Sequence, residues 1–510
     1  MSEDIPSGWE RSTLGNVASL SNEKCEPSST NVLRYIGLEH IESGSQRITG
    51  VGSSADVSST KSAFRAGNVL YGKLRPYLKK VCRPTFDGIC STDILVFSES
   101  PSIDNGFLLH FLSRQETASF ATQNASGINL PRINSTTLGE LAIGIPPLAE
   151  QRRIVAKIEA LQERSRKARE ALSEVGPLME QFRQSLLAAA FRGNLTADWR
   201  AANPNVEPAL ELLKRIRQER HRHWEESELT KFAKKSTDPK NDKWKDKYPE
   251  PQPFKFDGHL PEIPPTWEWT NWDTLTMWIT YGFTRPMPHV EAGPMIVTAK
   301  NVRNEGLRLD VVDYTTEKAF AELNFKDLPI PGDILIIKDG ATTGRAALVP
   351  EGIGGFCINQ SVGVVWLKYS PMNRLFLLRW VQSPLIQKMI QEAMSGMAMP
   401  HLSVTDFKAM PVPIPPLKEQ LAICEIMEGG LDFSDRLRDY SLGAASDLTQ
   451  LDQSILAKAF RGELVPQDPN DEPASVLLER IRKQRHETAQ NKNLKPLKAT
   501  KHTKKAGSVT

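Results

Sequence analysis

The phrase IPPLAEQRRIVAKIE at Ile145–Glu159 returns, with changes, as IPPLKEQLAICEIME at Ile414–Glu428. A second phrase repeats at the same spacing, because SLLAAAFRGNL at Ser185–Leu195 returns as SILAKAFRGEL at Ser454–Leu464. Both repeats lie 269 positions apart (145 to 414 and 185 to 454). This period is far longer than the ~20–50 residues of a solenoid repeat. The chain is therefore a duplication of one large unit.

Weaker similarities extend the repeat through the segments that precede these phrases. Their offsets rise in order along the chain, so the two halves align through a few small insertions. Each half is then a variable segment followed by a helical segment. The matched phrases are PSGWE near Trp9 with PPTWE near Trp267 (offset 258), GNVLYGKLRPYLKK at Gly67–Lys80 with GDILIIKDGATTGR at Gly332–Arg345 (offset 265), and SGINLPRI at Ser126–Ile133 with SGMAMPHL at Ser395–Leu402 (offset 269).

The helical segments carry apolar residues at alternating steps of four and three, beginning at Ile154. This is the seam of a coiled coil, whether antiparallel or parallel. Each helix should begin just after a Pro-Pro pair and end at the glycine of AFRG, Gly193 or Gly462. Pro177 should kink the first helix, because it has no N–H for the carbonyl four residues earlier. The Gly429–Gly430 pair likewise argues against a regular coil in the second.

The seams are expected to pack on each other, and small residues near the helix ends would leave room for another chain. The residues proposed for partner contacts are Ala188, Ala189, Ala190, Arg192, Ala457, Lys458 and Arg461. A second helix with a basic end follows each coil. Between the halves, a stretch rich in Lys and Pro is typical of an extended linker.

The variable segments contain short β-rich runs separated by Gly, Ser and Asn, which predict α/β domains. In the first, Gly72–Arg83 carries five basic residues and no acidic one; in the second, Lys338 and Arg345 stand opposite Lys73 and Lys80. Such cations can neutralise DNA phosphates, or guard an exposed edge strand. The candidate DNA-contacting residues are Lys73, Arg75, Tyr77, Lys79, Lys80, Arg83, Arg132, Lys338, Thr342, Thr343, Arg345 and His401.

The composition sets broad limits on the class of protein. A chain of 510 residues with 39% hydrophobic and 25% charged residues is an ordinary globular one, with a net charge of only +3. Its five cysteines are widely spread and include no C-x-x-C pair, which argues against disulfides and a zinc site. No secretory signal and no membrane-spanning run is evident. We expect a cytoplasmic protein without membrane partners.

Catalytic motifs are missing from the sequence. It has no phosphate-binding G-x-x-x-x-G-K-[ST] and no Asn-Pro-Pro-aromatic tetrapeptide of an amino-methyltransferase. Pro331–Lys338 superficially suggests a nuclease, but Ile336 stands where a second metal-binding carboxylate is expected. His221 and His223 lie in a basic helix end without other ligands, which favours a solvated role over a metal site.

Together, the two IPPL-x-EQ phrases, the long helices and the phrases AAAFRGNLTADWRAANP and SILAKAFRGELV resemble the DNA-specificity subunits of type I restriction–modification systems. The resemblance covers nearly the whole chain. It implies an α+β protein with two α/β target-recognition domains joined by two long antiparallel coiled-coil regions in a pseudo-twofold internal repeat. The implied divisions are recognition domains 1–144 and 264–413, helical regions 145–225 and 414–490, a linker 226–263 and a basic disordered tail 491–510.

The resemblance also implies a noncatalytic subunit that reads a bipartite site in double-stranded DNA. Its partners would be two adenine-methyltransferase subunits and two ATP-driven restriction subunits. S-adenosylmethionine, ATP and Mg²⁺ would be bound by those partners, and no cofactor or metal by this chain. Two other readings stay open: a stand-alone nuclease or methyltransferase, and a stand-alone coiled-coil DNA-binding or scaffold protein without a restriction role.

Overall fold

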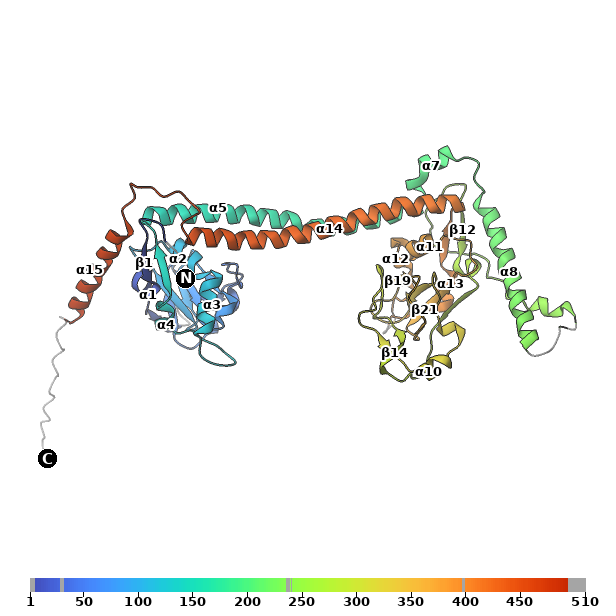
Figure 1. Cartoon of the computed structure of the whole chain (residues 1–510), viewed down its shortest axis with the longest axis horizontal. Helices are drawn as coiled ribbons and strands as arrows, with labels where there is room; N and C mark the ends of the chain where they lie inside the picture. The colour runs from blue at the N-terminus through green and yellow to red at the C-terminus, as the bar shows by residue number, and fades with distance from the viewer. Residues whose placement is uncertain (1–4, 28–31, 235–238, 240, 397–399, 494–510) are drawn as a thin grey trace, which may run out of the picture. The chain divides into compact units, whose positions relative to one another are not determined.

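The structure is a computed structural model that describes residues 5–27, 32–234, 239, 241–396 and 400–493. It divides into two compact units, one of Met1–Ser173 with Leu442–Thr510 and one of Glu174–Ser441 (Figure 1). Each unit contains one of the two variable domains and parts of both helical segments. The contacts therefore cut across the chain-order division into domain, helix, linker, domain and helix. No helix among the described residues is long and apolar enough to cross a membrane.

The domain of the first unit contains two sheets, with strand orders β2-β10-β7-β8 and β3-β6-β9-β4-β5. Neighbouring strands are antiparallel except β4 and β9, which are parallel. Strands β1 and β11 pair separately and join the start of the domain to its end. The strands are β1 (Glu10–Thr13), β2 (Ser19–Leu20), β3 (Lys24–Cys25), β4 (Arg34–Ile36), β5 (Gly52–Ser53), β6 (Lys61–Phe64), β7 (Val69–Gly72), β8 (Val81–Cys82), β9 (Gly88–Cys90), β10 (Ile94–Ser98) and β11 (Ala142–Ile145).

Short helices accompany these sheets: α1 (Leu14–Val17), α2 (Asn105–Leu112), α3 (Gln115–Gln123) and α4 (Ser135–Gly139), with 3-10 turns η1 (Leu38–His40), η2 (Ser54–Asp56) and η3 (Pro76–Leu78). Strand β7 shows why the domain has two cores. Val69 and Tyr71 face a core shared with α2, and Leu70 faces the core between the two sheets. Because side chains alternate along a strand, a continuous apolar run fills both cores.

The domain of the second unit repeats this plan. Its four-stranded sheet has the order β13-β21-β18-β19, a three-stranded sheet has the order β17-β14-β20 with β14 and β20 parallel, and β12 pairs with β22. The strands are β12 (Glu268–Asn271), β13 (Trp278–Tyr281), β14 (Val290–Val297), β15 (Val302–Arg303), β16 (Gly306–Leu307), β17 (Asp313–Tyr314), β18 (Ile334–Ile337), β19 (Ala346–Leu348), β20 (Phe356–Ile358), β21 (Val362–Trp366) and β22 (Pro411–Ile414). The helices are α9 (Trp272–Leu275), α10 (Glu317–Ala321), α11 (Arg374–Val381), α12 (Pro384–Ala393) and α13 (Val404–Ala409), with the 3-10 turn η6 (Phe325–Asp327).

The long helices begin and end where the sequence predicts. Helix α14 runs without a break over Leu417–Phe460, and its counterpart is α5 (Leu148–Ser173) followed by α6 (Val175–Phe191). The interruption at Glu174 lies three residues before Pro177, which cannot donate to the carbonyl of Ser173, as the sequence predicts. The glycine pair in α14 does not interrupt that helix. Gly430 instead lets α6 approach closely, because a Cβ there would lie 2.6 Å from Leu186 Cδ2.

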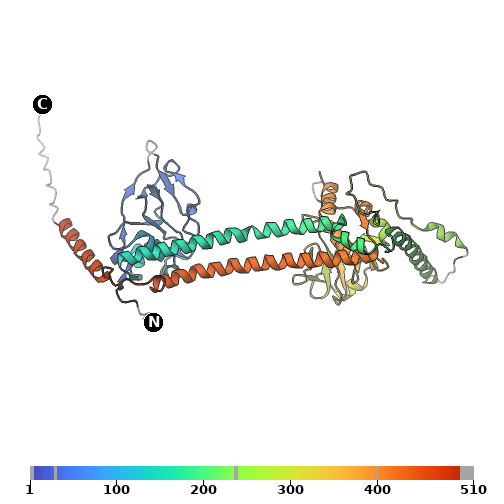
Figure 2. The ribbon, with the colours of Figure 1, turned by 90° about the horizontal axis from the view of Figure 1, so that it is seen from above.

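The long helices pack antiparallel in each unit, and the predicted seams are confirmed only in part. Ile154, Ile158 and Ile455 share a buried core, whereas the seam residues Phe182 and Leu451 are 38% and 49% exposed. In the first unit, α5 lies beside the C-terminal part of α14 (Figure 2), and Arg169 donates to Asp452 across the pair at 2.7 Å. In the second, Arg183 of α6 donates to Asp435 of α14 at 2.9 Å. Within the first unit Arg153 also pairs with Asp471, and within the second unit Leu186 of α6 lies against Gly430 of α14. In each unit, therefore, one residue number rises as its partner's falls, which is the antiparallel direction.

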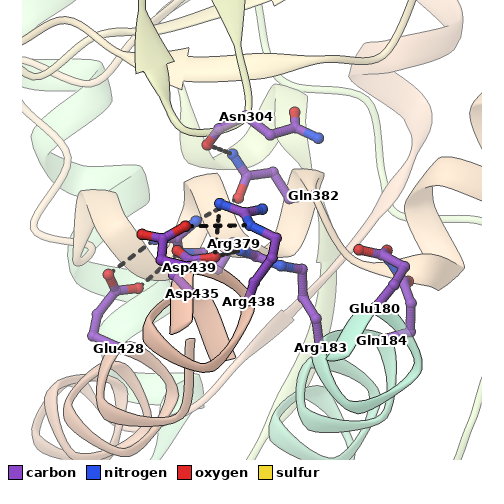
Figure 3. A network of polar contacts seen from close by, with 10 residues as sticks. All are labelled: Glu180, Arg183, Gln184, Asn304, Arg379, Gln382, Glu428, Asp435, Arg438 and Asp439. Carbon is purple, nitrogen blue, oxygen red and sulfur yellow. Dashed lines mark hydrogen bonds and ion pairs between the residues drawn. The ribbon is translucent and has the colours of Figure 1, made fainter. Parts of the chain in front are cut away.

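A polar network anchors α14 to the second domain (Figure 3). Arg379 of α11 makes a bidentate pair with Glu428 of α14, at 2.7 and 2.9 Å, and also donates to Gln382. Gln382 in turn donates to the carbonyls of Asn304 and Ala346, each at 2.9 Å. Because an arginine–carboxylate fork fixes direction as well as distance, it holds α14 in register on the domain.

The segments after the coils are partly as expected. Helix α7 (Ala197–Ala202) leads to α8 (Ala209–Lys234), which continues past the predicted boundary at residue 225. The predicted extended linker 226–263 is wrong in part, since the 3-10 turn η5 (Asp242–Lys247) folds back on α8. Trp244 stacks on Trp224 with ring centroids 5.8 Å apart, and this apolar contact explains the return. Helix α15 covers Ala474–Asn493, and nearly all of the predicted tail 491–510 lies outside the described residues.

Candidate nucleic-acid interface

The two candidate DNA-contacting loops of the first domain lie side by side. One follows β7 and contains η3; the other joins α3 to α4. The N–H of Arg75 donates to the carbonyl of Pro131 at 2.7 Å, and the N–H of Ile133 donates to that of Lys73 at 3.1 Å. A single surface therefore contains both the basic loop and the SGINLPRI loop.

The second domain makes the same connection with different residues. The N–H of Gly340 donates to Pro400 at 3.1 Å, and the N–H of Leu402 donates to Lys338 at 2.8 Å. These are the positions expected from offsets of 265 for the first loop and 269 for the second. Isolated bridges also match, Leu74 with Arg132 and Asp339 with His401. The two domains thus keep one backbone frame beneath dissimilar side chains, as the alignment predicts for His401 and Arg132.

The basic loop of the first domain has an unusual backbone. Arg75 and Lys79 are left-handed, with φ of 51° and 49°. Their counterparts in the second domain are Gly340 and Gly344, with φ of 98° and 95°, which suffer no Cβ penalty. An ordinary residue in this conformation costs roughly 1–2 kcal/mol. Side-chain cations kept at such positions are typical of a functional loop.

The predicted cations of the first domain differ in their availability. Arg132 is held by Asp93 through two bonds of 3.0 and 3.3 Å, Lys80 donates to the carbonyl of Leu38 at 2.6 Å, and Arg83 pairs with Glu159 at 3.6 Å. In the part of the chain that the structure describes, Lys73, Arg75 and Lys79 enter no ion pair, and Tyr77 is half exposed. These four side chains are the ones free to meet a ligand.

An acidic residue organises the corresponding site in the second domain. Asp339 accepts from Lys338 at 2.7 Å and lies 2.6 Å from His401 Nδ1. Burial opposes ionisation of Asp339, but the bonds from Lys338 and His401 outweigh it and hold the pKa of this carboxyl below its usual range. Lys338 is only 8% exposed and lies 5.0 Å from the centre of the Tyr281 ring. It is placed to position Asp339 rather than to reach the surface as predicted.

The other predicted residues of the second domain shape a turn. Thr343 donates its hydroxyl to the carbonyl of Gly340 at 2.7 Å, and the N–H of Gly344 donates to Ile337 at 2.8 Å. Thr342 is half-buried, and Arg345 is exposed and enters no ion pair with the residues described. Arg345 is therefore the available cation here.

The residues predicted for partner contacts differ in how far they are exposed. Ala190 is fully buried in the core of the second unit beside Phe191, so its proposed role at a partner surface is wrong. Its methyl group is needed for close packing of α6 on the domain. Ala188, Ala189 and Ala457 are half-buried, Arg192 and Lys458 are exposed, and Arg461 pairs with Glu463 at 2.9 Å.

Each unit contains a tryptophan–glutamate hydrogen bond that was not predicted from the sequence. The indole N–H of Trp9 donates to Glu150 at 3.0 Å, and that of Trp267 donates to Glu419 at 2.9 Å. Both glutamates belong to the IPPL-x-EQ phrases. Two features of the sequence could have predicted these bonds. One is the charged residue repeated within each apolar phrase, and the other is the tryptophan repeated near the start of each domain. Beside each glutamate, a buried glutamine, Gln151 or Gln420, binds the backbone at the start of a domain helix.

No group of three or more metal-ligating side chains occurs among the described residues. His221 and His223 are separated by different partners, since His221 packs on Tyr248 and His223 stacks on Tyr369. The five cysteines are free.

Comparison with known proteins agrees with this arrangement. The 510-residue chain is 33% identical to the specificity subunit of the EcoDI type I restriction enzyme of Escherichia coli over 222 residues, which cover 42% of this chain and half of that protein. It is 25% identical to the EcoBI specificity subunit of Escherichia coli over 374 residues, 71% of this chain and 68% of that one.

Solved structures share the fold. A chain from a study of complex assembly and conformational transition of the type I R-M system superposes with a TM-score of 0.63, covering 90% of this chain and 99% of that one at 22% identity. The HsdS subunit from Thermoanaerobacter tengcongensis gives a TM-score of 0.57, with 90% and 98% covered at 22% identity. The family model "Type I restriction modification DNA specificity domain" matches residues 6–173 and 290–432, one stretch in each half. Since these stretches make up more than half of the chain, the protein belongs to the type I restriction–modification DNA specificity family.

Proposed function

We propose that the chain is the noncatalytic DNA-specificity subunit of a type I restriction–modification complex, in which each domain reads one half of a bipartite target. The observation that carries this proposal is the repeated pairing of a basic loop with a second loop, made by the same backbone bonds in both domains. A duplicated frame with different side chains is what two different half-sites require.

The charges on these surfaces support a DNA ligand. Lys73, Arg75 and Lys79 in the first domain and Arg345 in the second are not neutralised by described carboxylates. Phosphate contacts of this kind position a protein on the duplex, while neighbouring side chains read base edges. Arg132 and His401 stand at matching positions, and each is held by an aspartate, although Asp93 and Asp339 come from different parts of their domains. We propose that these two side chains are oriented for the second task.

Exposed apolar side chains on α14 support partner binding by the helices. Leu421, Phe433 and Tyr440 are 57%, 50% and 74% exposed. We propose that helices of this kind dock two adenine-methyltransferase subunits, and that two ATP-driven restriction subunits join them. S-adenosylmethionine, ATP and Mg²⁺ would be bound by those partners.

The test is to co-express the chain with its methyltransferase subunit and to map methyladenine in the host DNA. We expect a split target, and exchange of residues 6–143 for the domain of a relative should change one half of it only. Methylation that ignores a split target, or that is unaffected by the exchange, would contradict the proposal. Cutting or methylation by the purified chain alone would point to a stand-alone enzyme.

A charge test examines the two loops directly. Arg75→Gln and Arg345→Gln should each weaken DNA binding by the complex and reduce the slope of log affinity against log salt by about 0.9 per lost phosphate contact. Arg65→Gln is the matched control, because Arg65 lies at the other end of β7 and pairs with Glu23 and Asp87. Binding that does not depend on salt would favour a scaffold without a DNA role.

A further inference from the structure

The loop between α3 and α4 exposes apolar side chains at its tip. Ile128 is 100% exposed and Leu130 is 45% exposed; the next most exposed large hydrophobic residue among those described is Tyr440, at 74%. In Figure 1 this segment extends away from the body of the first domain, beyond α3. A loop tip is ordinarily polar, so a fully exposed branched aliphatic side chain there is unexpected.

The tip is presented by a closed hairpin. Ser126 and Arg132 exchange both backbone bonds, each 2.9 Å long. Gly127 permits the turn, since it has φ of +99° and a Cβ there would lie 3.1 Å from the carbonyl oxygen of Leu130. The base of the hairpin is tied to the basic loop through Arg75 and Pro131. The apolar side chains are thus held outward on a braced stem.

Basic residues adjoin the base of the stem. Arg75 and Lys73 belong to the adjoining loop, and Arg132 at the foot of the hairpin is fixed by Asp93. An apolar tip framed by positive charge suits a DNA duplex, whose phosphates flank an apolar stack of bases. Proteins that kink DNA use Ile, Leu and similar side chains as wedges between neighbouring base pairs.

We propose that Ile128, supported by Leu130, is a wedge that enters the base stack of the first half-site between two neighbouring base pairs. This inference rests on the proposed DNA-reading function and adds a mechanism to it. Lys73 and Arg75 of the adjoining loop would hold phosphates beside the wedge, and the wedge would favour a base step that unstacks easily. Pyrimidine–purine steps have that property, so the wedge would contribute sequence preference without hydrogen bonds to bases.

The test uses the full chain assembled with its methyltransferase subunit and a duplex that carries the mapped target. The fluorescent base 2-aminopurine replaces each adenine of the first half-site in turn, because unstacking raises its emission. The adenine that becomes methylated is left unchanged, since the methyltransferase takes that base out of the stack itself. The variant is Ile128→Ser, and the matched control is Val51→Ser, which removes a 47% exposed aliphatic side chain from another loop of the same domain. Because Ile128 makes no buried contact, its replacement leaves the domain folded.

We expect the wild-type complex and the Val51→Ser control to raise emission at one step. Ile128→Ser should abolish that rise and bind about tenfold more weakly, which is the low end for losing burial of one aliphatic side chain. A mismatch at the same step should reduce the difference between variant and control, because the bases are then already unstacked.

Two results would overturn the wedge while leaving DNA reading intact. One is equal affinity and equal emission for Ile128→Ser and the control. The other is a loss of methyltransferase binding by Ile128→Ser without DNA, which would make the tip a protein contact. If the wild-type complex binds no DNA, the proposed function itself fails and the wedge fails with it.

Discussion

Replacement of Arg200 by methionine should destabilise the second unit by about 3 kcal/mol. Arg200 donates to Glu419 at 2.5 Å, and Glu419 is fully buried. The carboxylate also accepts from Trp267 at 2.9 Å and from the hydroxyl of Thr196 at 2.7 Å. Methionine preserves most of the apolar stem of arginine but leaves a buried negative charge without its cation.

The expected size follows from the surroundings of the carboxylate. Removing one partner of a buried ion pair costs roughly 3–5 kcal/mol. The low end applies here, because Glu419 keeps two neutral donors and the Arg200 side chain is 20% exposed. Adding Glu419→Gln to Arg200→Met removes the charge, so the double variant should regain a large part of the loss.

The assay is urea unfolding of the full chain, followed by hydrogen exchange in peptides from each unit. Separate probes are needed since two units need not unfold together. Arg153→Met is the control, because Arg153 pairs with Asp471 in the first unit with 36% and 9% of the two side chains exposed. Its loss of stability should be smaller than that of Arg200→Met, because more of Arg153 is in contact with water, which screens the charge left on Asp471. Equal losses for the two single variants, or no recovery in the double variant, would refute the reasoning.

Two further predictions concern buried polar groups. Burial raises the pKa of Asp333 to about 6, so the folded state keeps this proton to a higher pH than the unfolded state. The free energy of unfolding of the second unit should therefore fall by up to about 3 kcal/mol between about pH 4 and about pH 7. Urea titrations of Asp333→Asn should show a weaker dependence of that free energy on pH, and an unchanged dependence would contradict the assignment to Asp333. Gln151→Leu should cost about 2–3 kcal/mol in the first unit, since it leaves the N–H of Asp104 and the carbonyl of Pro146 unpaired. Its counterpart Gln420→Leu should lower the denaturation midpoint of the second unit only. A loss of stability in both units would contradict the view that each glutamine stabilises only its own unit.

The sequence predicted which positions of the two domains correspond, because a repeat preserves register; that the two loops bond to each other came from the structure. Offsets of 265 and 269 are enough to place Lys338 against Leu402 in the second domain once Lys73 is matched to Lys338 and Ile133 to Leu402. Backbone bonds depend on position rather than on side-chain identity. The ends of α14 were predictable for a similar reason, since Pro-Pro and AFRG act through backbone geometry.

Burial of individual side chains was not predictable in the same way. Lys338 and Ala190 stand in phrases that suit exposed residues, yet Tyr281 and Asp339 enclose the lysine and the domain core encloses the alanine. Tyr281 lies far from Lys338 in the sequence, although Asp339 follows the lysine directly, and the core around Ala190 includes Phe376 and Trp380 of the second domain. Which segments form each unit could not be predicted either, because the contacts within a unit join residues as far apart in the sequence as Arg153 and Asp471.

If the two loops read DNA as we propose, the contrast between them explains how one backbone frame can serve two half-sites. The second domain meets the left-handed backbone requirement with Gly340 and Gly344 and places its free cation at Arg345. The first meets the same requirement with Arg75 and Lys79, at a conformational cost of roughly 1–2 kcal/mol each. The backbone bonds between the loops are thus common to both domains, while the position of positive charge on them differs. Specificity can diverge at those positions without disturbing the fold.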